Sequence, residues 1–364
     1  MTARPDRDTA SRFPPPARGL KGRARELTTL VHTAIATAPS RLALVGSGGS
    51  GKSMLAIALC HRLAPRFEGR VDWFRVGAWD AGTLLEMLAL RFGTSRDRAT
   101  IVSSLRAFLL AGGERLIVLD NHEDDRAMAR LLEALSGTPA SIVITARRCL
   151  LSGVLIFPVT APLVTSGQAA FPRVARLTPL LRWNPLALDI ADAIVGSGAA
   201  TPIELAAYLE EAGVSRVRVI DHEDDLPEVS LLVDWAWKRL GAPSRRLWGT
   251  LSHVEGDNVD LDSLAKLSRV KNQAKQALAA LESWHLVQEP MRGRYAVHAV
   301  VRYAVAKRST LDAARVCEHY VSLLEAHPER LSMEQTHLYA AMDHAHRTSD
   351  LGAMLRIEKL LERL

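Results

Sequence analysis

The most informative chemical pattern in the sequence is a glycine-rich stretch, GSGGSGKS, that runs from Gly46 to Ser53. Its glycines allow the backbone to turn successive N–H groups around anionic oxygens. Lys52 can bridge the β- and γ-phosphates of a nucleotide, and the Ser53 hydroxyl can ligate Mg²⁺. The stretch lies between an apolar segment and a helical one, as a phosphate-binding loop requires. The sequence therefore predicts an ATP or ADP site with Mg²⁺ that is built from Gly46, Ser47, Gly48, Gly49, Ser50, Gly51, Lys52, Ser53 and Met54.

An acidic residue at the end of a second apolar run, RLIVLD, is placed to complete the metal site. Asp120 closes this run, and an aspartate at the carboxyl edge of a strand can hold Mg²⁺ through water close to Ser53. The next residue, Asn121, is neutral, whereas fast ATPases often carry a carboxylate there to orient the attacking water. Glu123 is near enough to act as the base, or it is a solvated acid of the next helix. The prediction is hydrolysis below about 1 s⁻¹, or none.

Two arginines follow a third apolar run, SIVITA, at residues 141–146. A guanidinium at the carboxyl edge of a parallel sheet points toward phosphates that lie over that edge. Arg147 is therefore a candidate sensor of the γ-phosphate, and the alternative is a salt bridge on the surface or between domains. The candidate catalytic residues are Lys52, Asp120, Glu123 and Arg147.

The elements that must position these residues are short apolar runs that alternate with helical segments. The runs lie at 41–46, 71–76, 115–120, 141–146 and 154–159, and their length and composition are typical of buried strands. Alternating strands and helices imply right-handed βαβ units and a parallel sheet that is covered on both faces. Residues 21–160 are therefore predicted to form a nucleotide-binding α/β domain.

The character of the sequence changes after residue 160. Residues 161–225 are predicted to form a helical domain that ends in an acidic linker, DHEDD. Residues 226–308 contain four helical segments and then a hairpin with its turn near Arg292 and Gly293, which is the order of a winged-helix domain. Residues 309–364 have the pattern of amphipathic helix. They are predicted to be a helical segment, the start of a helical-repeat sensor or a part that needs a partner.

Composition and charge exclude several classes of function. The chain has 364 residues, 48% of them apolar, and no apolar run reaches the roughly 18 residues that suggest a membrane span. Three cysteines without metal-ligand spacing favour buried thiols in a reducing cytosol, so the expected location is cytoplasmic. The net charge of +6 is concentrated in the first 25 residues, which begin with a predicted disordered basic tail at 1–20. The near-neutral remainder lacks the basic face that nucleic-acid binding usually requires.

Seven segments occur in an order that resembles a known family. They are KGRARELTTL, VDWFRVG, LIVLDN, SIVITAR, WNPLALDIA, LLVDWAWKRLGAPSRRLW and RYAVHAVVRYAVA, and together they extend over about residues 20–308. In this order they resemble the STAND class of signal-transducing P-loop ATPases, and especially the NB-ARC arrangement in large bacterial transcriptional activators. The resemblance implies an α/β nucleotide-binding domain, a helical domain and a winged helix in succession.

The resemblance also implies roles for residues outside the loop. Gly22 and Arg23 would line the base and ribose side of the nucleotide, and Pro185 would pack on the adenine. His298, at the histidine of the MHD-like motif, would reach the β-phosphate of ADP and latch the winged helix closed.

Two positions depart from the pattern of the family. Ala299 stands where many members have aspartate, which implies a differently built latch. Trp183 and Asn184 replace the usual Gly-Leu before Pro185, a change that affects packing more than chemistry.

The function that the sequence favours is a regulatory switch with an ADP-bound closed state and an ATP-bound open or oligomeric state. Its expected partners are nucleotide and either further copies of itself or a protein effector. The alternative is a DNA-binding ATPase, because Lys266, Arg269, Lys271 and Lys275 lie on a helix-turn-helix-like stretch and the basic tail could add phosphate contacts. A third possibility is a scaffold that uses nucleotide only to fold.

Overall fold

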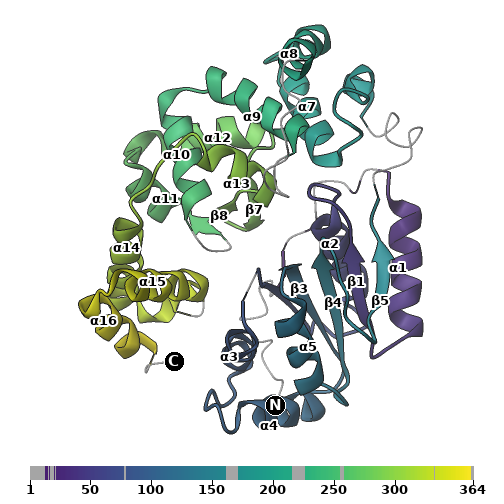
Figure 1. The fold of residues 1–364 in the computed structure, drawn as a ribbon, viewed down its shortest axis with the longest axis vertical. Coiled ribbons are helices and arrows are strands. Elements are labelled where there is room, and N and C mark those ends of the chain that lie inside the picture. Colours follow the sequence, from purple (N-terminus) through teal and green to yellow (C-terminus); the bar gives the residue numbers. More distant parts are fainter. Residues whose placement is uncertain are drawn as a thin grey trace, which may run out of the picture. The chain divides into compact units, whose positions relative to one another are not determined.

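The apolar runs that the sequence marks as strands form one parallel sheet in the computed structural model (Figure 1). Its strand order is β2-β3-β4-β1-β5, and every neighbouring pair is parallel. The predicted fold class, a parallel-sheet P-loop domain followed by a helical region, is confirmed. The strands are β1 (Arg41–Val45), β2 (Val71–Arg75), β3 (Arg115–His122), β4 (Ala140–Ala146) and β5 (Leu155–Pro158).

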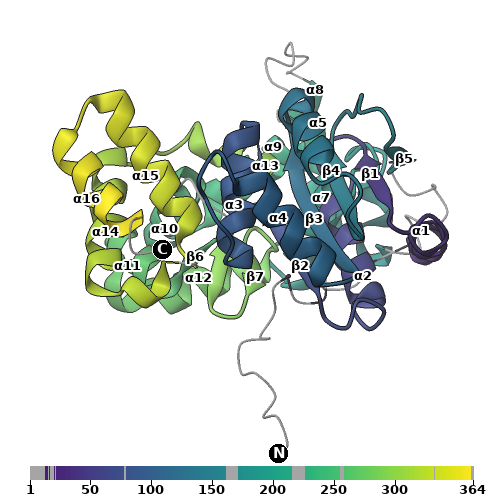
Figure 2. The ribbon, with the colours of Figure 1, turned by 90° about the horizontal axis from the view of Figure 1, so that it is seen from below.

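Helices cover both faces of this sheet (Figure 2). The helices are α1 (Ala24–Ala36), α2 (Lys52–Leu63), α3 (Ala81–Phe92), α4 (Ile101–Ala111) and α5 (Asp125–Ala134). Leu42 and Leu44 of β1 share a buried cluster with α1 and α2, whereas Ala43 between them packs with α3, α4 and α5. Side chains of a strand alternate between its two faces, so β1 supplies both hydrophobic layers at once. The run at 154–159, expected to be a buried strand, differs: β5 lies at the edge of the sheet, and its Leu155 and Ile156 are 48% and 43% exposed.

The structure describes residues 13, 14, 16, 20, 22–77, 79–160, 171–214, 226–254, 258–331 and 333–361. The chain divides into two units, Met1–Ser166, which contains the α/β sheet, and Gly167–Leu364. The predicted acidic linker, the start of the predicted helical domain at 161–170 and most of the basic tail lie outside the described residues. Four tail residues are described, Phe13, Pro14, Pro16 and Leu20, and the first two contact His61 of α2. Phe13 lies 4.8 Å from the His61 ring, and the Pro14 carbonyl is 2.9 Å from its Nε2.

The second unit is helical apart from one small sheet. Its helices are η1 (Pro172–Leu177), α7 (Pro185–Gly196), α8 (Pro202–Val214), α9 (Pro227–Arg239), α10 (Ala242–His253), α11 (Leu261–Ser268), η2 (Lys271–Gln273), α12 (Ala274–Ser283), α13 (Ala299–Ala306), α14 (Ala313–Ala326), η3 (Pro328–Arg330), α15 (Gln335–Thr348) and α16 (Leu351–Leu361). Elements η1 to α13 share one large apolar cluster around Trp235 and Trp248, and α14 to α16 enclose a smaller one. Among the described residues, no helix is long and apolar enough to cross a membrane.

The small sheet is antiparallel, with the order β6-β8-β7. The predicted hairpin forms β7 (Gln288–Met291) and β8 (Arg294–Ala296), joined by Arg292 and by Gly293, which has a φ of 74°. Glycine suits this left-handed turn position because it has no Cβ. The third strand, β6 (Val259–Asp260), is only two residues long and was not expected from the sequence. The predicted winged-helix designation of residues 226–308, like the other domain boundaries, stays a prediction.

A buried charged cluster joins this sheet to the C-terminal helices. Glu334 is 0% exposed, and its two carboxylate oxygens accept hydrogen bonds from Nη1 and Nη2 of Arg294 at 2.7 and 2.6 Å. Arg330 donates to Glu334 at 2.6 Å and to Asp260 at 2.7 Å. Burial alone would raise the pKa of Glu334, but Arg294 holds it below its usual value. A buried carboxylate paired in this way is costly to break, so the cluster fixes β6 and β8 against η3.

Asp260 offers a way to measure this cluster. Burial opposes ionisation of Asp260, but hydrogen bonds from Ser263 and the charge of Arg330 lower its pKa from 3.8 to about 2. A pKa that is depressed on folding adds stability above the unfolded-state pKa, and this stability is lost as the pH falls toward the folded-state value. We expect Asp260→Asn, which can still cap α11, to lower the free energy of unfolding at pH 6 by up to about 2 kcal/mol.

The difference between wild type and Asp260→Asn should vanish as the pH approaches 2. It can be followed by urea denaturation, because five of the seven tryptophans lie in residues 167–364 and report on this unit. The control is Asp343→Asn, which removes an exposed ion pair with Arg347 and should have little effect. A difference that stays constant from pH 6 to pH 2 would contradict the assignment.

Candidate nucleotide-binding site

The predicted site residues of the first unit gather at the carboxyl edge of its sheet. β1 leads into the phosphate loop, β3 carries Asp120 near its end, and Arg147 directly follows β4. β1 and β4 are neighbours, and Gly46 N–H extends their pairing by donating to the Ala146 carbonyl at 3.2 Å. Because the carboxyl ends of parallel strands share one edge, three distant segments meet there. This edge is where open parallel sheets bind their ligands.

The phosphate loop has the close backbone approach that its glycines predict. A Cβ atom on Gly46 would lie 2.2 Å from the Val159 carbonyl oxygen, so no larger residue fits. Gly49 and Gly51 have φ values of 70° and 90°, in the left-handed region, and Gly51 caps the N-terminus of α2. The hydroxyl of Ser50 is buried and has no hydrogen-bond partner among the residues that the structure describes. A cradle that excludes side chains and contains an orphaned hydroxyl at a helix N-terminus fits a phosphate group.

Lys52 closes over this loop. Its Nζ donates to the carbonyl oxygens of Gly46 and Ser47, each at 2.8 Å. Burial lowers the pKa of Lys52 to about 8, and the positive charge of Arg147 acts in the same direction, while Asp120 opposes them. Two cations whose charges repel each other in this way favour an anion near them. The ammonium group can therefore exchange the two carbonyls for phosphate oxygens.

Asp120 is the centre of a hydrogen-bond cluster. The hydroxyls of Ser53 and Thr145 both donate to its Oδ1, at 2.7 and 2.6 Å, and Thr145 Oγ1 also accepts from the N–H of Asn121 at 2.9 Å. Asp120 and Thr145 are 8% and 1% exposed. The structure thus brings together the two predicted Mg²⁺ ligands, Ser53 and Asp120. Sequence reasoning missed Thr145, whose signal is a hydroxyl near the end of an otherwise apolar strand.

The segment after Asp120 departs from regular strand geometry. The β3–β4 register shifts between Leu119 and His122, and Asn121 has a φ of 63°. Asparagine tolerates this conformation better than most residues, and such a bulge redirects side chains beside a site. The Asn121 amide donates to Oε1 of exposed Glu123 at 2.8 Å. Glu123, the predicted base, therefore lies next to the neutral amide of Asn121, and the catalytic role of Glu123 stays a prediction.

Residues predicted to line the rest of the nucleotide have different surroundings. Arg23 is buried and donates to the backbone carbonyls of Ser50 and Thr160. Gly22 is exposed, with a φ of 73°, and Met54 lies half-buried in the first turn of α2. Arg148, next to Arg147, is exposed. The predicted base and ribose contacts of Gly22 and Arg23 are not tested by these positions.

Pro185 and His298 belong to the second unit. Pro185 occupies the first turn of α7, after Asn184, whose side chain accepts from the N–H groups of Leu186 and Ala187. His298 caps α13, and its Nδ1 accepts from Val300 N–H at 3.3 Å. Both side chains are half-buried. Their predicted contacts with adenine and the β-phosphate stay predictions.

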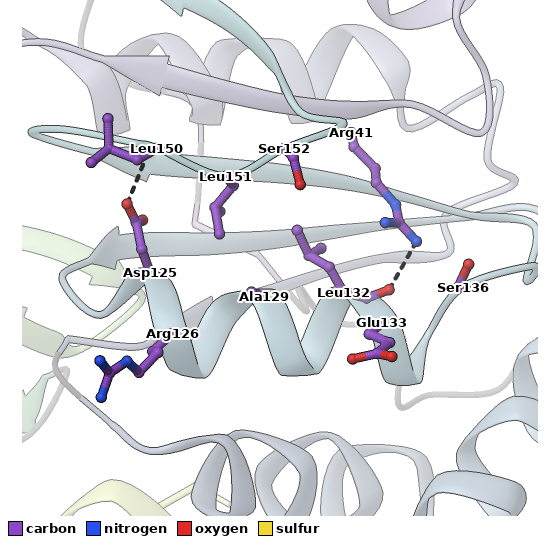
Figure 3. Close-up of a pocket in the computed structure, with 10 residues that line it drawn as sticks. All are labelled: Arg41, Asp125, Arg126, Ala129, Leu132, Glu133, Ser136, Leu150, Leu151 and Ser152. Carbon is purple, nitrogen blue, oxygen red and sulfur yellow. Dashed lines mark hydrogen bonds between the residues drawn. The ribbon is translucent and has the colours of Figure 1, made fainter.

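A hollow of about 610 Å³ beside α5 contains none of the predicted site residues (Figure 3). The Arg41 guanidinium crosses it to donate to the Leu132 carbonyl at 2.8 Å, and Leu150 N–H donates to Asp125. Leu150 itself is 89% exposed. The hollow is open and largely bridged by its own residues, so the carboxyl edge of the sheet remains the candidate site.

Comparisons with known proteins agree with this architecture. No family model matches the chain. The regulatory protein AfsR of Streptomyces coelicolor is 24% identical over an alignment of 309 residues that covers 77% of this chain and 31% of AfsR. A STAND protein with a tetratricopeptide repeat sensor from Pyrococcus horikoshii superposes with a TM-score of 0.62 and 18% identity. That match includes 96% of this chain and 51% of the archaeal protein.

A third match is weaker. Cdc6p from Pyrobaculum aerophilum gives a TM-score of 0.42 at 11% identity, over 81% of this chain and 96% of that one. The chain spans about a third of the length of AfsR and about half that of the archaeal STAND protein. From its P-loop to its C-terminal helices, the chain has the fold of a STAND-class P-loop ATPase, as the sequence resemblance predicts.

Proposed function

We propose that this chain is a signal-transduction switch that binds ATP and ADP with Mg²⁺. The observation that carries the proposal is the cluster in which Ser53 and Thr145 both donate to Asp120, beside the glycine cradle and Lys52. The names of two matched proteins, a regulatory protein and a signal-transduction ATPase, support a regulatory role.

The residues of the edge divide the work of holding a nucleotide. The N–H groups of the loop and Lys52 would bind phosphate oxygens, while Ser53 and Asp120 would hold Mg²⁺. Arg147 would sense the γ-phosphate as a second cation near Lys52. When bound, the Mg²⁺–nucleotide supplies a charge that differs between its diphosphate and triphosphate forms. Asn121 cannot act as a base, and the candidate base Glu123 accepts a hydrogen bond from the Asn121 amide, so hydrolysis should be slow or absent.

The switch requires that ATP and ADP have different affinities for two states of the chain. We propose a closed state with ADP and an open or oligomeric state with ATP, in which the chain contacts further copies or a protein effector. Residues 226–308 would act as a winged helix, an interpretation supported by the order α10, α11, α12 and then the β7–β8 hairpin. His298 would latch this module to ADP, and Pro185 would pack on its adenine.

A second candidate function is DNA binding. Three basic side chains of the helix-turn-helix-like stretch, Lys266, Arg269 and Lys275, are exposed on or beside α11 and α12. They could contact backbone phosphates. The near-neutral charge of residues 26–364 weighs against this function.

The first test is the identity of the nucleotide that co-purifies with the protein. We expect near-stoichiometric ADP after denaturation and chromatography of the supernatant. Lys52→Ala should lose it, because the ammonium group is the main cation of the loop. His298→Ala should retain less, because the latch is removed. An empty wild-type protein that binds neither ATP nor ADP below about 1 mM would contradict the switch.

A second test concerns Thr145, which orients Asp120. We expect Thr145→Val, which keeps the shape of the side chain, to raise the Mg²⁺ concentration needed for half-maximal ATP binding by about 10- to 100-fold. The measurement is a Mg²⁺ titration with a fluorescent ATP analogue. Thr138→Val serves as the control, because Thr138 is also buried but its hydroxyl donates to the Leu135 carbonyl and not to Asp120. An unchanged Mg²⁺ requirement in Thr145→Val would show that Asp120 needs no such support.

Binding to duplex DNA separates the two candidate functions. For a switch we expect a flat fluorescence-anisotropy curve up to about 10 µM protein at physiological salt. Salt-dependent binding that weakens when Lys266, Arg269 and Lys275 are replaced by alanine would favour the DNA-binding function instead. Joint replacement of the exposed Arg25, Arg62 and Lys359 by alanine provides a matched loss of three charges elsewhere.

A further inference from the structure

Arg23 is a buried cation whose partners are backbone groups of the phosphate loop. Its side chain is 3% exposed, and Nη2 donates to the carbonyl oxygens of Ser50 at 2.6 Å and Thr160 at 2.7 Å. Nη1 donates to both carboxylate oxygens of Glu26, at 3.0 and 2.8 Å. Glu26 therefore compensates the charge of the guanidinium. Through Nη2, the guanidinium links the phosphate loop to the segment that follows β5.

The position of Arg23 is fixed by the helix that it begins. Arg23 is the N-terminal cap residue of α1, and α1 packs on α2 through Leu30, which shares a buried cluster with Leu55 and Ala56. A Cβ atom placed on Gly51 would lie 3.7 Å from Arg23 Nε, so the guanidinium lies directly beside the start of α2. The arginine thus reaches the loop from a rigid element.

The contact with Ser50 determines the orientation of a peptide group. The Ser50 carbonyl and the Gly51 N–H belong to the same planar peptide, in which the two groups point to opposite sides. Because Arg23 holds the carbonyl toward α1, the Gly51 N–H is directed away from α1. Gly51 has a φ of 90°. Because glycine adopts positive and negative φ values about equally readily, its own preference does little to fix the orientation of this peptide.

We propose that Arg23 is a positioning residue for the nucleotide phosphates, a step that rests on the proposed function. It orients the Ser50–Gly51 peptide so that its N–H faces the β-phosphate of a bound nucleoside diphosphate. This role differs from contact with the base and ribose, which the family resemblance implies for Arg23.

The test compares ADP with AMP, which lacks the β-phosphate. In equilibrium dialysis of the full chain with radiolabelled nucleotides, we expect Arg23→Lys to weaken ADP binding at least tenfold and AMP binding much less. Lysine keeps the charge but cannot reproduce the planar fork that reaches two carbonyls and a carboxylate. Arg23→Gln is a second variant in case the buried lysine prevents folding. Arg25→Lys, on the exposed side of α1, is the matched control and should bind like the wild type.

A double-mutant cycle gives a second measurement. Arg23 and Lys52 would act on the same phosphates, so their effects on ADP affinity should not be independent. The loss of ADP affinity in the double variant of Arg23→Lys and Lys52→Ala should be at least threefold smaller than the product of the two single losses. Additive losses, or equal losses of ADP and AMP affinity, would overturn the positioning role in favour of base and ribose contact. A loss in Lys52→Ala with none in Arg23→Lys would overturn it and leave the switch intact. ADP binding that is unchanged in both variants would overturn the proposed function itself.

Discussion

The candidate site depends on the parallel pairing of β3, β4 and β1, which brings residues from distant parts of the sequence to one edge. Val45 pairs with Ala146, and the pairing of β3 with β4 is regular as far as Leu119 and Ile144. Beyond that point the bulge at Asn121 replaces the regular ladder by a hydrogen bond to the Thr145 hydroxyl. Asp120 can then accept from both β4 and α2, so an irregularity in the strand forms the side of the site that is proposed to hold Mg²⁺.

The phosphate loop poses a second requirement, because a backbone that directs N–H groups to a ligand must satisfy its carbonyls elsewhere. Lys52 binds the carbonyls of Gly46 and Ser47, and Arg23 binds that of Ser50. These two cations differ in their freedom. Arg23 is held by three partners and is nearly inaccessible to solvent, whereas Lys52 has partners that a phosphate can replace. One cation can therefore support the loop while the other exchanges carbonyls for ligand.

Local patterns in the sequence predict much of this arrangement. Apolar runs identify the strands because most strands of a parallel sheet are buried on both faces. The glycines identify the phosphate loop, and at Gly46 no residue with a Cβ atom would fit. The contacts that support the loop could not be predicted in the same way. Thr145 and Asp120 are 25 residues apart, and Arg23 and Thr160 are 137 residues apart. Hydrophobic periodicity reports on one element at a time, so it contains no information about such pairs.

The departure at Trp183 shows how one local preference can be replaced by other contacts. Arg182 and Trp183 have φ values of 48° and 57°, so the tryptophan adopts a conformation that suits the glycine of the family pattern. A non-glycine residue in this conformation costs about 1–3 kcal/mol and persists only where its surroundings hold it. Asn184 supplies such a restraint by capping α7 and donating to Glu228 of α9 at 3.3 Å. The position of Pro185 is therefore maintained by the cap of α7 and by a hydrogen bond to α9, without a glycine before it.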